Sequence, residues 1–219
     1  ITSCGITLHA VLSGDPQVIE ALVDAPYWRT LIPDVVATRT STIPESPDIF
    51  LIGTPESFFQ YEPSRQQITT DLDHIVSAIA TISYIFEHAR QAQECFTLHG
   101  NLVSDGNQKT IALIGGISGI GKSTLSAYIQ QRGWQWLSDD KSVVNAAARC
   151  IGAMSQPRGD AKTTNAIGTQ NMDTFHGDVS LSYLVIPLVT DEENLTVHYY
   201  DREKALWHIY EELSRDIRI

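Results

Sequence analysis

A glycine-rich motif in the middle of the chain has the residue types and the spacing that bind phosphate. It reads Gly116-Ile117-Ser118-Gly119-Ile120-Gly121-Lys122-Ser123 and satisfies G-x-x-x-x-G-K-[ST]. Its glycines let successive backbone N–H groups turn towards phosphate oxygens without a Cβ in the way. Lys122 can reach the β- and γ-phosphates of a nucleotide, and the Ser123 hydroxyl can ligate Mg²⁺. We therefore expect residues 116–124, Thr124 included, to bind ATP together with Mg²⁺.

The segments on either side of the motif are those that such a loop needs. Residues 110–114 are a short apolar run typical of a strand, and residues 123–132 have the spacing of a helix. The N-terminus of that helix would add its partial positive charge to the anion site. The sequence thus predicts strand, loop and helix in the order that phosphate binding requires.

A carboxylate is also needed, either to support the metal or to activate a nucleophile. Asp139 and Asp140 follow a predicted strand over residues 133–138, 17 residues after Lys122. Two adjacent carboxylates can divide these roles, and we expect Asp139 to be the general base and Asp140 to support Mg²⁺ with Ser123. The alternative is Asp191-Glu192, which follows an apolar run, although Asp191-Glu192-Glu193-Asn194 is also typical of a polar hairpin turn.

Three further polar residues are candidates for the same site. His99 lies 17 residues before Gly116 on a predicted strand, where it can donate a hydrogen bond to a phosphate or to Asp139; a hydrogen-bonded core histidine is the alternative. Arg158 and Lys162 can clamp the transferring phosphate, and solvated loop charges are the alternative for both.

Composition restricts the class of protein and its partners. Of 219 residues, 42% are hydrophobic and 19% charged, as in globular proteins, and the net charge of −11 argues against binding nucleic acid or an anionic membrane. No apolar run reaches about 18 residues, so we expect no transmembrane span. Three widely spaced cysteines without a C-x-x-C pair indicate reduced thiols and a cytoplasmic location. The first residues lack an initiator methionine, so we expect the chain to begin inside a longer reading frame or after processing.

The pattern along the chain predicts two regions. Residues 1–69 contain seven of the nine prolines and read as strands and loops, with a hairpin formed by 48–53 and 57–61 and a face that could contact substrate. Residues 70–219 would form the catalytic core, beginning with an amphipathic helix over 71–93. Within this core we expect a hairpin over residues 95–115, which would make the strand before the loop antiparallel to its neighbour.

The remaining segments of the core are assigned from turn and cap signals. Residues 145–178 read as irregular, and residues 181–189 and 195–200 read as a second hairpin. Asp201 is expected to cap a last helix, whose apolar residues would be Ala205, Leu206, Ile209, Tyr210 and Leu213.

Several short segments together resemble the catalytic core of the HPr kinase/phosphorylase family. They are Leu98-His99-Gly100, residues 114–125, Arg132-Gly133-Trp134 and Leu137-Ser138-Asp139-Asp140. The resemblance is closer to the smaller HPr-kinase-like relatives, and it implies an α/β phosphate-loop core of the PEP-carboxykinase-like type, with a mixed or antiparallel sheet. It also implies that the glycines of the loop, Lys122 and Ser123 contact ATP and Mg²⁺, with Asp139 or Asp140 as the base and His99 beside it.

The expected activity is transfer of phosphate from ATP to a hydroxyl group. Residues 145–165 carry no clear copy of the Arg-Gly-rich signature of true HPr kinases, so the resemblance favours a serine-type hydroxyl on a peptide or small molecule. The alternatives are a kinase/phosphorylase acting on an HPr-type carrier protein and an ATPase switch without an acceptor. We expect neither nucleic acid nor membrane as a partner, and a homo-oligomer is compatible with this assignment.

Overall fold

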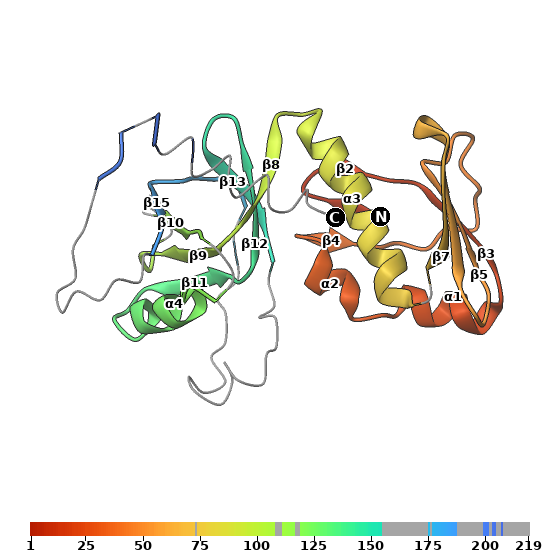
Figure 1. Cartoon of the computed structure of the whole chain (residues 1–219), viewed down its shortest axis with the longest axis horizontal. Helices are drawn as coiled ribbons and strands as arrows, with labels where there is room; N and C mark the ends of the chain where they lie inside the picture. Colours follow the sequence, from red (N-terminus) through yellow and green to blue (C-terminus); the bar gives the residue numbers. More distant parts are fainter. Residues whose placement is uncertain are drawn as a thin grey trace. The chain divides into compact units, whose positions relative to one another are not determined.

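The computed structural model of the chain is mixed α/β (Figure 1). It describes residues 1–72, 74–107, 111–116, 119–154, 175, 177–187, 199–201, 203, 204 and 207. Within these ranges the chain forms several β-sheets and four α-helices, which confirms the predicted α/β class. None of the helices in the same ranges has the length and apolarity needed to cross a membrane. The chain divides into two compact units, Ile1–Gln93 and Glu94–Ile219.

The division after Gln93 differs from the boundary between 69 and 70 expected from the sequence. Helix α3 (Ile75–Gln91) belongs to the first unit, because its buried face, which includes Ile79 and Phe86, joins the hydrophobic core of that unit. The predicted helix over residues 71–93 therefore packs in the core of the first unit and does not open the catalytic core. Its expected start is also wrong, because strand β7 (Gln67–Leu72) extends through the residues that were expected to open the helix.

The first unit contains two sheets. One is a three-stranded antiparallel sheet with the order β2 (Ile6–Thr7), β1 (Thr2–Ser3), β4 (Val35–Val36). The other is four-stranded with the order β3 (Ala10–Gly14), β5 (Ile49–Gly53), β6 (Phe58–Glu62), β7; its β3–β5 pair is parallel and the other pairs are antiparallel. The β5–β6 hairpin was predicted from the sequence and is confirmed.

Helices cover one face of the four-stranded sheet. α1 (Pro16–Val23) starts after Asp15, whose side chain accepts hydrogen bonds from the N–H groups of Gln17 and Val18. The short helix α2 (Tyr27–Leu31) and a 3-10 turn over Pro63–Arg65 complete the helical segments described in this unit. Strand alternation places Ile49 and Leu51 on the covered face, in one core with residues of α1 and α3.

Among its described residues, the second unit contains two four-stranded sheets and helix α4 (Lys122–Gln130). The first sheet has the order β11 (Gln135–Ser138), β9 (Asn101–Ser104), β10 (Ile111–Ile114), β15 (Tyr183–Val185). The second has the order β14 (Val179–Ser180), β13 (Arg149–Ala153), β12 (Lys141–Asn145), β8 (Cys95–His99). Helix α4 (Lys122–Gln130) packs on β9 and β11 (Figure 1).

Side-chain alternation arranges these elements in three layers. Leu102 and Leu113 belong to an apolar cluster that also contains residues of β8, β12 and β13, so this cluster lies between the two sheets. Their neighbours Val103 and Ile114 belong to the cluster under α4. The strands β9 and β10 therefore bury apolar side chains on both faces, Leu102 and Leu113 on one and Val103 and Ile114 on the other.

The first sheet has the mixed character that the sequence predicted. β10 is antiparallel to β9, which confirms the predicted hairpin, and parallel to β15. Within the span of that hairpin, residues 95–103 form two strands instead of one, and the expectation that residues 145–178 are irregular is wrong over residues 149–153. Gly100 separates β8 from β9, and β12 and β13 form an antiparallel hairpin over residues 141–153.

Two C-terminal expectations are tested only in part. The strand expected over 181–189 is shorter, at Tyr183–Val185, and most of its expected hairpin partner lies outside the described residues. Asp201 caps a following turn as expected, because its side chain accepts a hydrogen bond from the N–H of Lys204 at 2.9 Å. The apolar residues expected on that last helix lie outside the described residues.

Candidate functional site

The glycine-rich motif connects strand β10 directly to helix α4. β10 ends at Ile114, as the sequence predicted, and α4 begins at Lys122, one residue before its predicted start. Gly116, Gly119 and Gly121 have φ angles of 115°, 84° and 100°, in the left-handed region that favours glycine. Ile117 and Ser118 lie outside the described residues. The described part of the motif is therefore a tight loop whose glycines have left-handed backbone conformations. It lies at the N-terminus of a helix, where backbone N–H groups and the helix dipole favour an anion.

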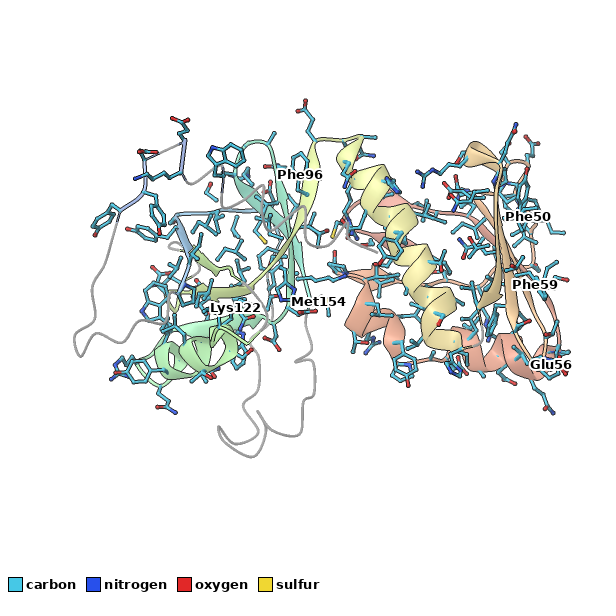
Figure 2. All side chains as sticks on the ribbon, in the orientation of Figure 1. Phe50, Glu56, Phe59, Phe96, Lys122 and Met154 are labelled. Carbon is cyan, nitrogen blue, oxygen red and sulfur yellow. The ribbon has the colours of Figure 1, made fainter. Side chains whose placement is uncertain are left out.

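Lys122 lies at the first position of α4, directly after the loop (Figure 2). Its side chain is 7% exposed, and its Nζ donates a hydrogen bond to the Gly116 carbonyl at 2.7 Å. An ammonium held in this position adds positive charge to the loop that contains the glycines. Thr124, also expected to contact nucleotide, is exposed on the first turn of α4, and Ile120 is half-buried.

Asp139 and Asp140 form the turn between β11 and β12, and both are 7% exposed. The Ser123 hydroxyl donates a hydrogen bond to Oδ1 of Asp139 at 3.0 Å. This hydrogen bond joins the β11–β12 turn to the first turn of α4, the helix that follows the glycine-rich loop. The two carboxylates are nearly enclosed by protein, where interactions between charges are stronger than in water.

His99 lies beside the second of these carboxylates. Its Nδ1 is 3.1 Å from Oδ1 of Asp140, and β8 pairs with β12 so that His99 is opposite Lys141. The sequence predicted a role for His99 near the phosphate site, with Asp139 as the carboxylate partner; the structure pairs it with Asp140 instead. The histidine and the two carboxylates, which are far apart in the sequence, therefore lie within one group of side chains.

Asn101 belongs to this group and was not predicted from the sequence. Its side chain is buried, and its Nδ2 donates to Oγ of Ser126 at 3.0 Å and to Oγ of Ser123 at 3.4 Å. Its Oδ1 accepts a hydrogen bond from the backbone N–H of Asp140 at 3.2 Å. One amide side chain thus ties helix α4 to the carboxylate turn. The signal available in the sequence was a polar residue directly before the apolar pair Leu102-Val103.

We expect Asn101→Ala to affect both the stability of the fold and the binding of nucleotide, and a matched control variant distinguishes the two effects. The substitution leaves the buried Asp140 N–H without this acceptor, which typically costs about 1–3 kcal/mol of stability. It should also weaken the binding of a fluorescent ADP analogue with Mg²⁺ about tenfold, because Ser123 and the turn lose their common partner.

Asn145→Ala is the matched control for that variant. Asn145 accepts hydrogen bonds from two backbone N–H groups in the β12–β13 turn, outside the site. It should lower stability to a similar extent and leave nucleotide affinity unchanged. Equal loss of affinity in both variants would contradict the positioning role of Asn101.

Gly100 allows the two sheets to meet at this site. A Cβ at this position would lie 2.8 Å from the carbonyl oxygen of Ile114 and 3.3 Å from Cα of Gly115. The N–H of Gly100 donates to the carbonyl of Asp140 at 2.8 Å. This hydrogen bond holds the chain at Gly100 in place, so it cannot easily shift to make room for a Cβ. Only glycine permits this close approach of β8–β9 to the residues that lead into the loop.

Replacing Gly100 by alanine should therefore lower the free energy of unfolding by about 1–3 kcal/mol, as overpacking against rigid backbone does. Urea denaturation followed by tryptophan fluorescence measures this. Gly106→Ala is the control, since a Cβ there would meet no atom within 4 Å. A Gly100→Ala variant as stable as the Gly106→Ala variant would show that the close approach described above does not occur.

Other predicted site residues lie outside the part of the chain that the structure describes. These are Arg158 and Lys162, expected to clamp phosphate, and the alternative carboxylates Asp191 and Glu192. Among the described residues there is no group of three or more His, Cys, Asp or Glu side chains that could hold a metal ion. Magnesium bound with a nucleotide does not require such a group, because it keeps waters and phosphate oxygens as ligands and uses one or two carboxylates.

Comparison with known proteins adds no family assignment: no protein-family model matches the sequence, and no curated protein matches it. The functional argument therefore depends on the residues and contacts of this chain.

Proposed function

We propose that the chain is an ATP- and Mg²⁺-dependent phosphotransferase that phosphorylates a hydroxyl group, of serine type, on a peptide or small molecule. The observation that carries this proposal is the hydrogen bond between Ser123 and Asp139. It joins a glycine-rich, lysine-containing loop to a buried pair of carboxylates, which is the combination that phosphoryl transfer needs.

The oxygen atoms at the helix terminus suit magnesium. The Ser123 hydroxyl and the Asp139 carboxylate are hard oxygen donors within 3.0 Å of each other, which is chemistry that Mg²⁺ prefers. In this proposal Ser123 and Asp139 hold the metal with the nucleotide phosphates. The bound metal would neutralise charge on those phosphates, and Lys122 would do the same from the loop.

The second carboxylate is placed to act on the acceptor. Asp140 is paired with His99 and not with Ser123, so it is the better candidate to accept the proton of an incoming hydroxyl. The acceptor oxygen then attacks the γ-phosphorus, the bond from that phosphorus to the β–γ bridging oxygen breaks, and ADP leaves. This division reverses the roles expected from the sequence, which made Asp139 the base and assigned Asp140 to the metal.

Transfer of label from [γ-³²P]ATP tests the proposal directly. The full chain with Mg²⁺ would be incubated with free serine, serine-containing peptides and an HPr-type carrier protein, with a Lys122→Ala variant as the blank. We expect label on a seryl hydroxyl of a peptide or small molecule. Label only on the carrier would favour a carrier-protein kinase, and release of phosphate with no labelled acceptor would favour an ATPase switch; either result contradicts the proposal.

A further inference from the structure

An apolar face lies on the four-stranded sheet of the first unit, opposite the helices. Its residues are Phe50, Ile52, Phe59, Tyr61 and Ile68, which are 36–68% exposed. Figure 2 labels Phe50 and Phe59 on the side of the sheet away from α3. We call these five residues the outer sheet face.

Strand alternation explains why five large side chains lie together. On β5 and β6, every second residue points to the buried core, and the residues between them point outwards. The register places Phe50 opposite Tyr61 and Ile52 opposite Phe59, while Tyr61 is opposite Ile68 on β7. The Phe50 and Tyr61 rings stack with centroids 6.2 Å apart. An exposed sheet face usually carries polar residues at these positions, so this one is suited to an apolar partner.

The size of the outer sheet face fits one helix better than a second copy of the chain. At roughly 200 Å² for a whole large side chain, the exposed fractions of the five residues correspond to about 450 Å² in total. A stable protein dimer buries about 800 Å² on each partner. The row Phe50, Tyr61, Ile68 crosses three strands, a width of about 10 Å at the usual strand spacing. That width equals the diameter of a single α-helix with its side chains, about 10–12 Å.

The net charge of the first unit indicates that the polar residues of the partner are basic. Residues 1–93 contain four arginines, no lysine and eleven acidic residues, a net charge of −7. One of the four, Arg90, is buried and paired with Glu87 at 2.7 Å. Glu56 is exposed in the turn between β5 and β6, at one end of the outer sheet face (Figure 2). A cationic partner is therefore attracted, and an anionic one is repelled.

We propose that the outer sheet face docks a basic amphipathic helix from a partner protein. Its apolar stripe covers the five residues, and its lysines or arginines flank the stripe and face the acidic surface of the unit. This interaction is independent of phosphoryl transfer, because none of its residues belongs to the group around Lys122 and Asp140.

The test uses the full chain and a synthetic 18-residue peptide, with leucines at i, i+3, i+4 and i+7 and lysines elsewhere. A peptide of the same composition without an apolar stripe is the control. Calorimetric titration should show micromolar binding of the striped peptide only. Phe59→Ser and Ile52→Ser should each weaken it about tenfold, because each removes a large apolar contact. Glu56→Lys should weaken it severalfold at low salt. Ile43→Ser, an exposed apolar residue outside the face, should not change binding.

Any of five results would overturn the proposal. Two concern the peptides: the striped peptide fails to bind, or the peptide without a stripe binds equally well. Ile43→Ser weakens binding as much as Phe59→Ser. Light scattering shows a wild-type dimer that Phe59→Ser converts to a monomer, in which case a second copy is the occupant. Finally, Phe59→Ser lowers the melting temperature by several degrees, which would show that the chain itself covers this face.

Discussion

Replacing Lys122 by alanine should reduce phosphoryl transfer by about 10²–10³-fold or more, with little loss of fold. The size follows from removing one charged donor that stabilises charge developing on the transferred phosphoryl group. The fold should persist because Nζ donates to the Gly116 carbonyl within the loop, and Lys122 belongs to neither apolar cluster of this unit. The measurement is the initial rate of label transfer at saturating ATP, with circular dichroism to verify the fold.

Lys204→Ala is the matched control for this prediction, because Lys204 is exposed and distant in sequence from the loop. It should transfer phosphate at the wild-type rate. A Lys122→Ala variant with near-normal turnover would show that the glycine-rich loop is not the active site, whatever the structure of its surroundings.

Asp139→Asn and Asp140→Asn should both lower the rate of phosphoryl transfer, but they should differ in their effect on its Mg²⁺ dependence. Asp140→Asn removes the proposed base and should lower the rate about 10²–10⁴-fold at unchanged Mg²⁺ requirement. Asp139→Asn should lower the rate and also raise the Mg²⁺ concentration needed for half-maximal activity, because it removes the carboxylate beside Ser123. Rates measured over a range of Mg²⁺ concentrations separate the two effects.

Asparagine is the substitution of choice at position 140 for a structural reason. The backbone of Asp140 has a φ of 76°, a left-handed conformation that asparagine adopts more readily than most residues. A rate loss in Asp140→Asn is therefore attributable to the carboxylate and not to the turn. Ser123→Ala is the companion variant for Asp139, and it should share the altered Mg²⁺ dependence.

The same pair of variants can reject the kinase assignment. If Asp139→Asn and Asp140→Asn both keep wild-type turnover while Asp191→Asn is inactive, the carboxylate turn is not the site. An ATPase that uses the later acidic segment would then replace a phosphotransferase as the assignment. If instead Asp139→Asn leaves the Mg²⁺ dependence unchanged and Asp140→Asn alters it, the roles are those expected from the sequence.

The parts of the fold predicted correctly from the sequence are those set by neighbouring residues. The order of strand, loop and helix around Gly116–Ser123 follows from apolar spacing and glycine positions, and the β9–β10 hairpin follows from a turn signal between two apolar runs. The cap at Asp201 depends on a single side chain three residues from its partner. Such features depend on contacts between nearby residues, so a short stretch of sequence is enough to specify them.

The tertiary structure decided which of these segments meet. The apolar face of residues 75–91 predicted a buried helix but did not show against which core it would pack, and this set the boundary after residue 93. Likewise, the sequence showed His99 and Asp140 as chemically suitable, while the pairing of β8 with β12 brought them within 3.1 Å. Asn101 became visible as a site residue only through its contacts with Ser126 and Asp140, because strand pairing between distant segments depends on packing that local preferences do not encode.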